Sequence, residues 1–201
     1  MTVRLFPFSV FFAIGIGFFL AIAPASALDL PMTQSDIRAA IDYGASTSPH
    51  VISGEPARQL GDADSSLKPW GQIITPFAAL AFASAEAHAK YENVTNELMR
   101  EVKAAKTFTV VANAFNTELH MNDDMIVVIK QNGKVIHPVS KSLDSDAEVI
   151  NMGDEAGYRT SLSAEFSYKT LNLAETFTVA IANYGMSGQE TDFLVDPTSF
   201  R

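Results

Sequence analysis

Serine, histidine and glutamate at helical spacing form the first group of side chains in this sequence that could do chemistry. Ser84, His88 and Glu92 are four residues apart, so on a helix they would share one face. Their types match a hydrolase triad, but a triad also needs an exposed nucleophile and free N–H donors for an oxyanion. Because the N–H groups inside a helix are already bonded, a solvated or capping column is the better interpretation.

The same helix offers two possible metal ligands. His88 and Glu92 have the spacing of helical zinc ligands. A third ligand would have to come from His50, His120 or His137, and nothing in their spacing selects one of them. An exposed polar helix face explains both residues, so we predict neither a metal nor a cofactor here.

An acidic stretch is the best candidate for a cation site. Asp144, Asp146 and Glu148 alternate along the chain, so on an extended segment their carboxylates would share one face. Oxygen-rich clusters of this kind suit calcium. A solvated acidic loop is the commoner explanation, and we predict weak calcium binding at most.

Two aromatic residues are candidate partner contacts. Trp70 is the single tryptophan and follows Pro69 at the end of a segment without periodicity, and Tyr184 lies at a predicted hairpin tip. Aromatic side chains often anchor interfaces. For Trp70, a plug in the core where a loop crosses it is the commoner role, and we favour that interpretation.

Composition excludes several classes of function. The 201 residues include 14 lysines and arginines against 23 aspartates and glutamates, and the net charge of -9 argues against nucleic-acid binding. The absence of cysteine removes disulfides, thiol catalysis and cysteine-ligated zinc. No phosphate-binding glycine loop, nucleophile elbow or redox pair is visible. With 47% apolar residues the chain can still build a packed core.

The N-terminus has the pattern of a secretory signal peptide over residues 1–27. Arg4 precedes an apolar run over 5–23, and the small residues Ala25 and Ala27 mark a cleavage site. We therefore predict export to the periplasm or the extracellular space. The alternative is an uncleaved anchor, because residues 5–23 approach the roughly 20 residues that span a bilayer. Only in that case do we expect contact with a membrane.

Residues 28–106 are predicted to be a helical N-terminal region that contains a long irregular loop over 45–72. Serine, threonine, proline, glycine and aspartate dominate this loop. A loop of such length inside a compact domain is typically functional or mobile.

Two helical patterns flank that loop. The first covers 33–44, with Thr33 or Ser35 as its N-cap and Gly44 at its C-terminal end. The second begins at Thr75-Pro76 and is rich in alanine. Residues 76–105 form either one helix or two, and the sequence leaves this open.

From residue 107 onward the periodicity changes to that of β-strands. Asn132-Gly133 indicates a tight hairpin between two of them. Seven candidates follow one another at sandwich-like spacing: 108–111, 125–129, 135–137, 147–151, 158–166, 176–183 and 190–195. We predict an α+β fold in which the N-terminal helices pack on a seven-stranded antiparallel β-sandwich over 107–201.

The last two predicted strands resemble a known fold. Leu173 precedes the aromatic Phe177 by four residues, an alternating apolar strand follows, and Tyr184, Gly185 and Gly188 suit a hairpin tip. This pattern resembles the E–F corner and F–G hairpin of immunoglobulin-like and fibronectin type III-like domains. The resemblance implies an immunoglobulin-like sandwich and no particular activity. Phe177 stands where such domains usually carry a corner tyrosine, so the usual hydroxyl hydrogen bond is missing.

These patterns together predict an exported, non-enzymatic binding or structural module of the cell envelope. Its partner would be an envelope protein or a glycan, contacted through the loop over 45–72 or the tip over 184–188. One alternative is an extracytoplasmic hydrolase with its site between the alanine-rich helix and the sheet. Another is a membrane-tethered protein anchored by residues 5–23.

Overall fold

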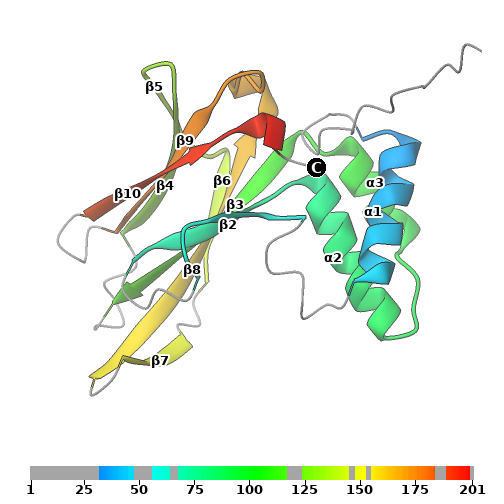
Figure 1. Ribbon diagram of the computed structural model, residues 1–201, viewed down its shortest axis with the longest axis horizontal. Coiled ribbons are helices and arrows are strands. Elements are labelled where there is room, and N and C mark those ends of the chain that lie inside the picture. The colour runs from blue at the N-terminus through cyan, green and yellow to red at the C-terminus, as the bar shows by residue number, and fades with distance from the viewer. Residues whose placement is uncertain are drawn as a thin grey trace, which may run out of the picture.

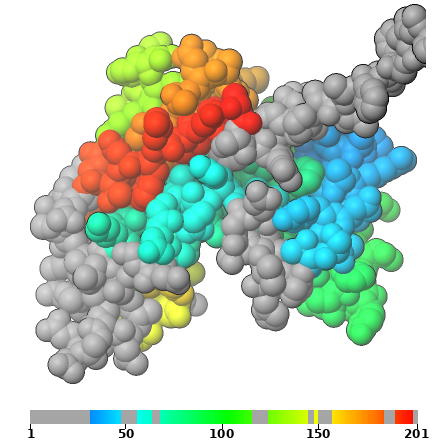
Figure 2. All heavy atoms as spheres, in the orientation of Figure 1, coloured from blue at the N-terminus to red at the C-terminus, as the bar shows by residue number. Residues whose placement is uncertain are grey.

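The structure is a computed structural model of the chain. It describes residues 32–47, 56–63, 68–116, 124–144, 148–152, 155–183 and 189–199. Within these ranges the chain forms three α-helices and two antiparallel β-sheets, in agreement with the predicted α+β class. The helices gather on one side of the strands (Figure 1), and their atoms form a separate layer in Figure 2. The predicted signal peptide lies outside the described residues.

The helices are α1 (Gln34–Ser46), α2 (Pro76–Ala89) and α3 (Asn96–Ala104). The side chain of Thr33 accepts the N–H of Asp36, whose carboxylate in turn accepts the N–H of Thr33 at 2.7 Å. This capping box starts α1 as predicted. Thr75 caps α2 by accepting the N–H of Ala78 at 3.2 Å, which confirms the second predicted start.

Residues 76–105 form two helices. After α2 the backbone turns at Tyr91, whose φ of 59° lies in the left-handed region. The side chain of Thr95 then accepts the N–H of Leu98 at 3.2 Å and caps α3. A left-handed residue cannot continue a right-handed helix, and this explains the break.

The prediction that Gly44 ends the first helix is wrong. Gly44 lies inside α1, and the helix ends at its C-cap Thr47. A Cβ atom at position 44 would come 2.2 Å from the carbonyl oxygen of Ala81 on α2. The glycine therefore serves the close approach of the two helices.

Two antiparallel sheets contain all the described strands. The larger sheet has β1 (Arg58–Leu60), β2 (Trp70–Ile74), β3 (Thr107–Asn116), β8 (Glu155–Ser167) and β6 (Ser140–Leu143) in that order, and β7 (Glu148–Met152) also pairs with β8. The smaller sheet has the order β10 (Gln189–Val195), β9 (Phe177–Asn183), β4 (Met125–Gln131) and β5 (Lys134–Ile136).

The seven predicted strands all have counterparts, but the described residues contain ten strands. β6 was missed, and β1 and the start of β2 fall inside the predicted irregular loop over 45–72, so that prediction is wrong at those positions. β1 has only three residues, too few for a visible alternation, and its pairing with β2 supplies its hydrogen bonds. Because β2 pairs with β3, the larger sheet also uses residues before position 107.

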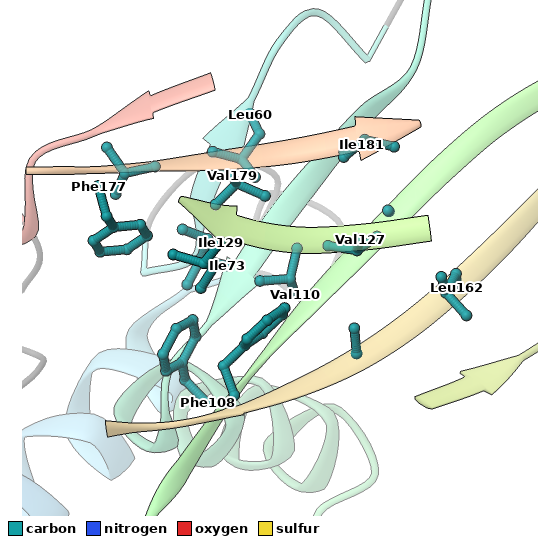
Figure 3. Close-up of a cluster of buried hydrophobic side chains, with 14 of the residues drawn as sticks. Leu60, Ile73, Phe108, Val110, Val127, Ile129, Leu162, Phe177, Val179 and Ile181 are labelled. Carbon is teal, nitrogen blue, oxygen red and sulfur yellow. The ribbon is translucent and has the colours of Figure 1, made fainter. Parts of the chain in front are cut away.

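The two sheets share one hydrophobic core, an arrangement compatible with a β-sandwich. Figure 3 shows buried side chains of both sheets converging on one another. The ring of Phe108 on β3 lies 5.8 Å from Phe166, 5.1 Å from Tyr168 and 6.4 Å from Phe177, between ring centroids. These rings close the end of the core nearest the start of β9.

A second, smaller cluster holds the helices together. Ile37 and Ala40 of α1 meet Leu80 of α2 and Val102 of α3. Phe77, in the first turn of α2, packs against both this cluster and the core of the sheets. It is therefore a direct apolar link between the two parts. None of the described helices has the length and apolar character needed to span a membrane.

Candidate functional site

Ser84, His88 and Glu92 do not assemble into a triad. The Ser84 side chain is buried, and its hydroxyl donates to the carbonyl oxygen of Ile41 on α1 at 2.8 Å. His88 is exposed in the last turn of α2, and Glu92 follows the end of the helix. The serine thus contributes to helix packing, where no substrate could reach its hydroxyl.

The acidic stretch is divided in the structure. The carboxylate of Glu148 on β7 forms an ion pair with Arg159, its register partner on β8. Asp144 is exposed after β6, and Asp146 lies outside the described residues. Within the described ranges, no three histidine, aspartate or glutamate side chains come close enough together to hold a metal ion. Sequence reasoning missed Arg159 because its pairing with Glu148 comes from strand register.

Trp70 is part of the larger sheet, and the interpretation of it as a loop residue is wrong. It begins β2, is half-buried, and pairs in register with Asn113 of β3. Its indole nitrogen is buried without a hydrogen-bond partner among the described residues. The second aromatic candidate, Tyr184, lies outside the described residues. Trp70 builds no recognisable site with the other described residues.

An apolar groove at the edge of the two sheets is the most site-like feature of the described surface. Its volume is about 380 Å³, and its lining comes from Ile126, Val127, His137, Pro138, Val139, Ser140, Lys141 and Leu162. We call it the β4 groove. Leu162 and Val127 are buried at its base, and Figure 3 shows both at one end of the core. Ile126 and Val139 are large apolar side chains that remain 40% and 60% exposed.

The β4 groove exists because the chain changes sheets after β5. β5 is short and pairs only with Ile129–Gln131 of β4. After Pro138 the chain joins the larger sheet, where the N–H of Val139 donates to the carbonyl oxygen of Glu165 at 2.8 Å. The first half of β4, Met125–Val128, is therefore left without a strand on this side among the described residues.

The charge of the β4 groove is positive. His137 and Lys141 are its only titratable lining residues, and neither forms an ion pair with another described residue. Lys130, in contrast, projects to the other edge of the sheet and bonds to Glu190 and Asp192 of β10, and these bonds raise its pKa. In a chain of net charge -9, the groove is a local exception.

A second groove, between α1 and α3, is larger but has fewer features of a binding site. It encloses about 560 Å³ and is lined by Gln34, Ile37, Asn96, Met99, Arg100 and Lys103. Its apolar members Ile37 and Met99 also belong to the packing between the helices. It offers no open backbone edge, and we favour the β4 groove as the candidate site.

Sequence reasoning missed the β4 groove, although one signal was present. Ile126 alternates out of phase with the buried Met125, Val127 and Ile129, so it had to point away from the core. An apolar side chain at such a position is a candidate contact residue.

Comparison with known proteins found no matching family model, no matching curated protein and no matching solved structure. The candidate site therefore stands on its own geometry.

Proposed function

We propose that this protein is an exported, non-enzymatic binding module of the cell envelope and that it binds through the β4 groove. The observation that carries the proposal is the exposure of Ile126 and Val139, which both line an apolar groove with an open strand edge. Exposed apolar surface in a concave site is typical of binding sites. Export is supported by the signal pattern over 1–27, and we propose an envelope protein or a glycan as the partner.

We also propose that the sandwich is immunoglobulin-like. The order β2-β3-β8-β6 in one sheet and β10-β9-β4-β5 in the other corresponds to A-B-E-D and G-F-C-C′ of that architecture. In this correspondence β1 and β7 are additions, and α2 and α3 lie between the first two strands. Phe177 begins the strand equivalent to F, where it packs against Phe108 in place of the usual tyrosine contact.

The packing of Phe77 supports the module over the hydrolase alternative. A hydrolase site between α2 and the sheets would need a cavity at that junction. Phe77 instead contacts the apolar clusters on both sides of it. The buried hydrogen bond of Ser84 also leaves α2 without an available nucleophile at that position.

The test is capture of envelope components by immobilised protein, followed by identification of what is retained. We expect the double substitution Ile126→Lys and Val139→Lys to abolish retention, because it places two charges across the groove. Leu194→Lys is the matched control, since Leu194 is 74% exposed on β10 and lies away from the groove. An identical retained set with the double variant would show that the β4 groove is not the binding surface. Release of a cleaved product from a retained component would favour the hydrolase.

A further inference from the structure

We propose that the β4 groove takes an extended polypeptide segment of a partner protein, which adds to the open edge of β4 as a further strand. This inference rests on the proposed function of the same groove and specifies its occupant. The arguments are the direction of the backbone groups, the alternation of the groove walls, and charge.

The hairpin between β4 and β5 determines which backbone groups face the open edge. Its two-residue turn has positive φ at Asn132 (52°) and Gly133 (73°), so the flanking pair Gln131 and Lys134 exchanges both hydrogen bonds. Backbone N–H and C=O groups alternate sides along a strand. The backbone N–H and C=O groups of Val127 and Met125 therefore point to the same side of β4 as those of Gln131. At Val127 and Met125, however, β5 has already ended. No described strand pairs with these groups.

The walls of the groove fit a segment with alternating apolar side chains. A strand placed in line with β5 would direct every second side chain toward Leu162 at the base of the groove. The side chains between them would lie beside Ile126 on the outer face of β4. Val139 also lines the groove and is 60% exposed, so we expect both faces of the added strand to bury apolar surface.

The charge of the groove lining also indicates what kind of segment binds. Lys141 and His137 line the groove without any carboxylate among the lining residues, so we infer that the bound segment carries a carboxylate beside Lys141. A second copy of this chain is disfavoured because both copies carry a net charge of -9. The lining contains no tryptophan, tyrosine or phenylalanine on which a sugar ring would stack, which disfavours a glycan.

The other edge of the same sheet explains why addition is specific to β4. β10 carries the exposed carboxylates of Glu190 and Asp192 along its length. Charged side chains on an edge strand oppose pairing with another chain. β10 also has the exposed Leu194, but the open part of β4, Met125–Val128, carries no charged side chain, and β-strand addition uses such an edge.

The probe is a fluorescent seven-residue peptide of alternating valine and threonine with a C-terminal glutamate, titrated into the full exported chain by fluorescence anisotropy. Two further peptides carry backbone N-methyl groups at alternate residues, each blocking one edge of the extended peptide. We expect one of them to bind at least about tenfold more weakly and the other to bind like the parent, because only one peptide edge meets β4.

Variants of the protein test the walls and the charge. Ile126→Lys should weaken binding of the parent peptide about tenfold, and Leu194→Lys should leave it unchanged. Lys141→Glu should weaken binding of the glutamate peptide and strengthen binding of a peptide ending in lysine. Circular dichroism and thermal unfolding confirm that each variant is folded.

Equal binding of both N-methylated peptides, or no binding of the parent peptide, would overturn strand addition. If capture of an envelope component then still depends on Ile126, the proposed function survives with another occupant. Concentration-dependent dimerisation that Ile126→Lys abolishes would instead identify a second copy as the occupant and overturn the inference. If neither assay depends on Ile126, the proposed function fails as well.

Discussion

Tyr91 holds a backbone conformation that residues with a side chain rarely adopt. Its φ is 59°, its N–H donates to the carbonyl oxygen of His88 at 3.1 Å, and its side chain is 99% exposed. With so little contact, the side chain offsets none of the cost of a left-handed residue. Glycine adopts this conformation without that cost.

We therefore expect Tyr91→Gly to raise the free energy of unfolding by about 0.5–1 kcal/mol, after the larger chain entropy of glycine in the unfolded state is subtracted. Urea unfolding measures the change. Glu92→Gly is the control, since Glu92 is exposed in the same turn at an ordinary φ and should lose stability. A loss of stability in Tyr91→Gly would show that the tyrosine makes a stabilising contact.

Tyr168 is a buried phenol without a hydrogen-bond partner among the described residues. Its ring packs on Phe108, and burial raises the pKa of its hydroxyl. We expect Tyr168→Phe to raise the free energy of unfolding by about 1 kcal/mol at neutral pH, because an unpaired buried hydroxyl is removed.

The difference in free energy of unfolding between Tyr168→Phe and the natural protein should grow above pH 10. The unfolded chain releases the phenol proton near pH 10, whereas the folded protein keeps it to higher pH, so this group makes the natural protein lose stability as the pH rises. Urea unfolding at pH 7 and at pH 10.5 measures this difference. Tyr158→Phe is the control, because Tyr158 is only half-buried. An unchanged gap between the two pH values would mean that the hydroxyl reaches solvent or a partner.

At the scale of the elements, α1 and α2 approach so closely that one methyl group would separate them. A Cβ on Gly44 would meet the carbonyl oxygen of Ala81 at 2.2 Å, the Cβ of Ser84 at 2.7 Å and the backbone nitrogen of Ala85 at 2.9 Å. Two of these atoms are backbone, so the helices would have to move apart.

We expect Gly44→Ala to lower the free energy of unfolding by about 2–3 kcal/mol, although alanine is favoured over glycine in helices by about 1 kcal/mol. Chemical unfolding measures it. Asp42→Ala, an exposed substitution on the same helix, should change stability by less than about 0.5 kcal/mol. If Gly44→Ala stabilises the protein, the gain in helix propensity exceeds the cost of the clash with α2. The two helices then do not approach as closely as described.

Phe77 packs on both apolar clusters and so joins the helices to the sheets. Truncating its side chain should let the helices unfold separately from the sheets. We expect Phe77→Ala to lower the free energy of unfolding by about 3 kcal/mol. Hydrogen exchange should then accelerate in α1 and α2 while β3 and β8 stay protected. Phe82→Ala is the control, because Phe82 is half-buried on α2 but belongs to neither cluster. Equal acceleration in all elements would show that the two parts unfold as one unit.

At the scale of the whole molecule, the pattern over residues 1–27 leads to a prediction about export. If residues 1–27 are a signal peptide, the chain isolated from its native host begins at Leu28, because a narrow peptidase site accepts the small Ala25 and Ala27. We expect Ala27→Phe to block cleavage and leave the protein with the membrane.

Ser26→Leu is the matched control, since position 26 lies between the two small residues and should tolerate a larger side chain. Intact mass and N-terminal sequencing read out both variants. A natural chain that retains residues 1–27 would establish the anchored alternative and remove the free exported module.

Features that depend on residues close together in the chain could be predicted from the sequence. The caps at Thr33 and Thr75, the turn at Asn132-Gly133 and the positions of the longer strands all follow from neighbouring residues. Local hydrogen bonds and side-chain periodicity decide such features within a few residues.

Only the tertiary structure determined which distant residues meet. The role of Gly44, the hydrogen bond of Ser84 to α1, and the pairing of Glu148 with Arg159 each depend on how two elements pack or align. The open edge of β4 likewise depends on where β5 stops and the chain crosses to the other sheet. Such contacts join residues far apart in the chain, and packing and register in three dimensions select them, so no short window of sequence contains them.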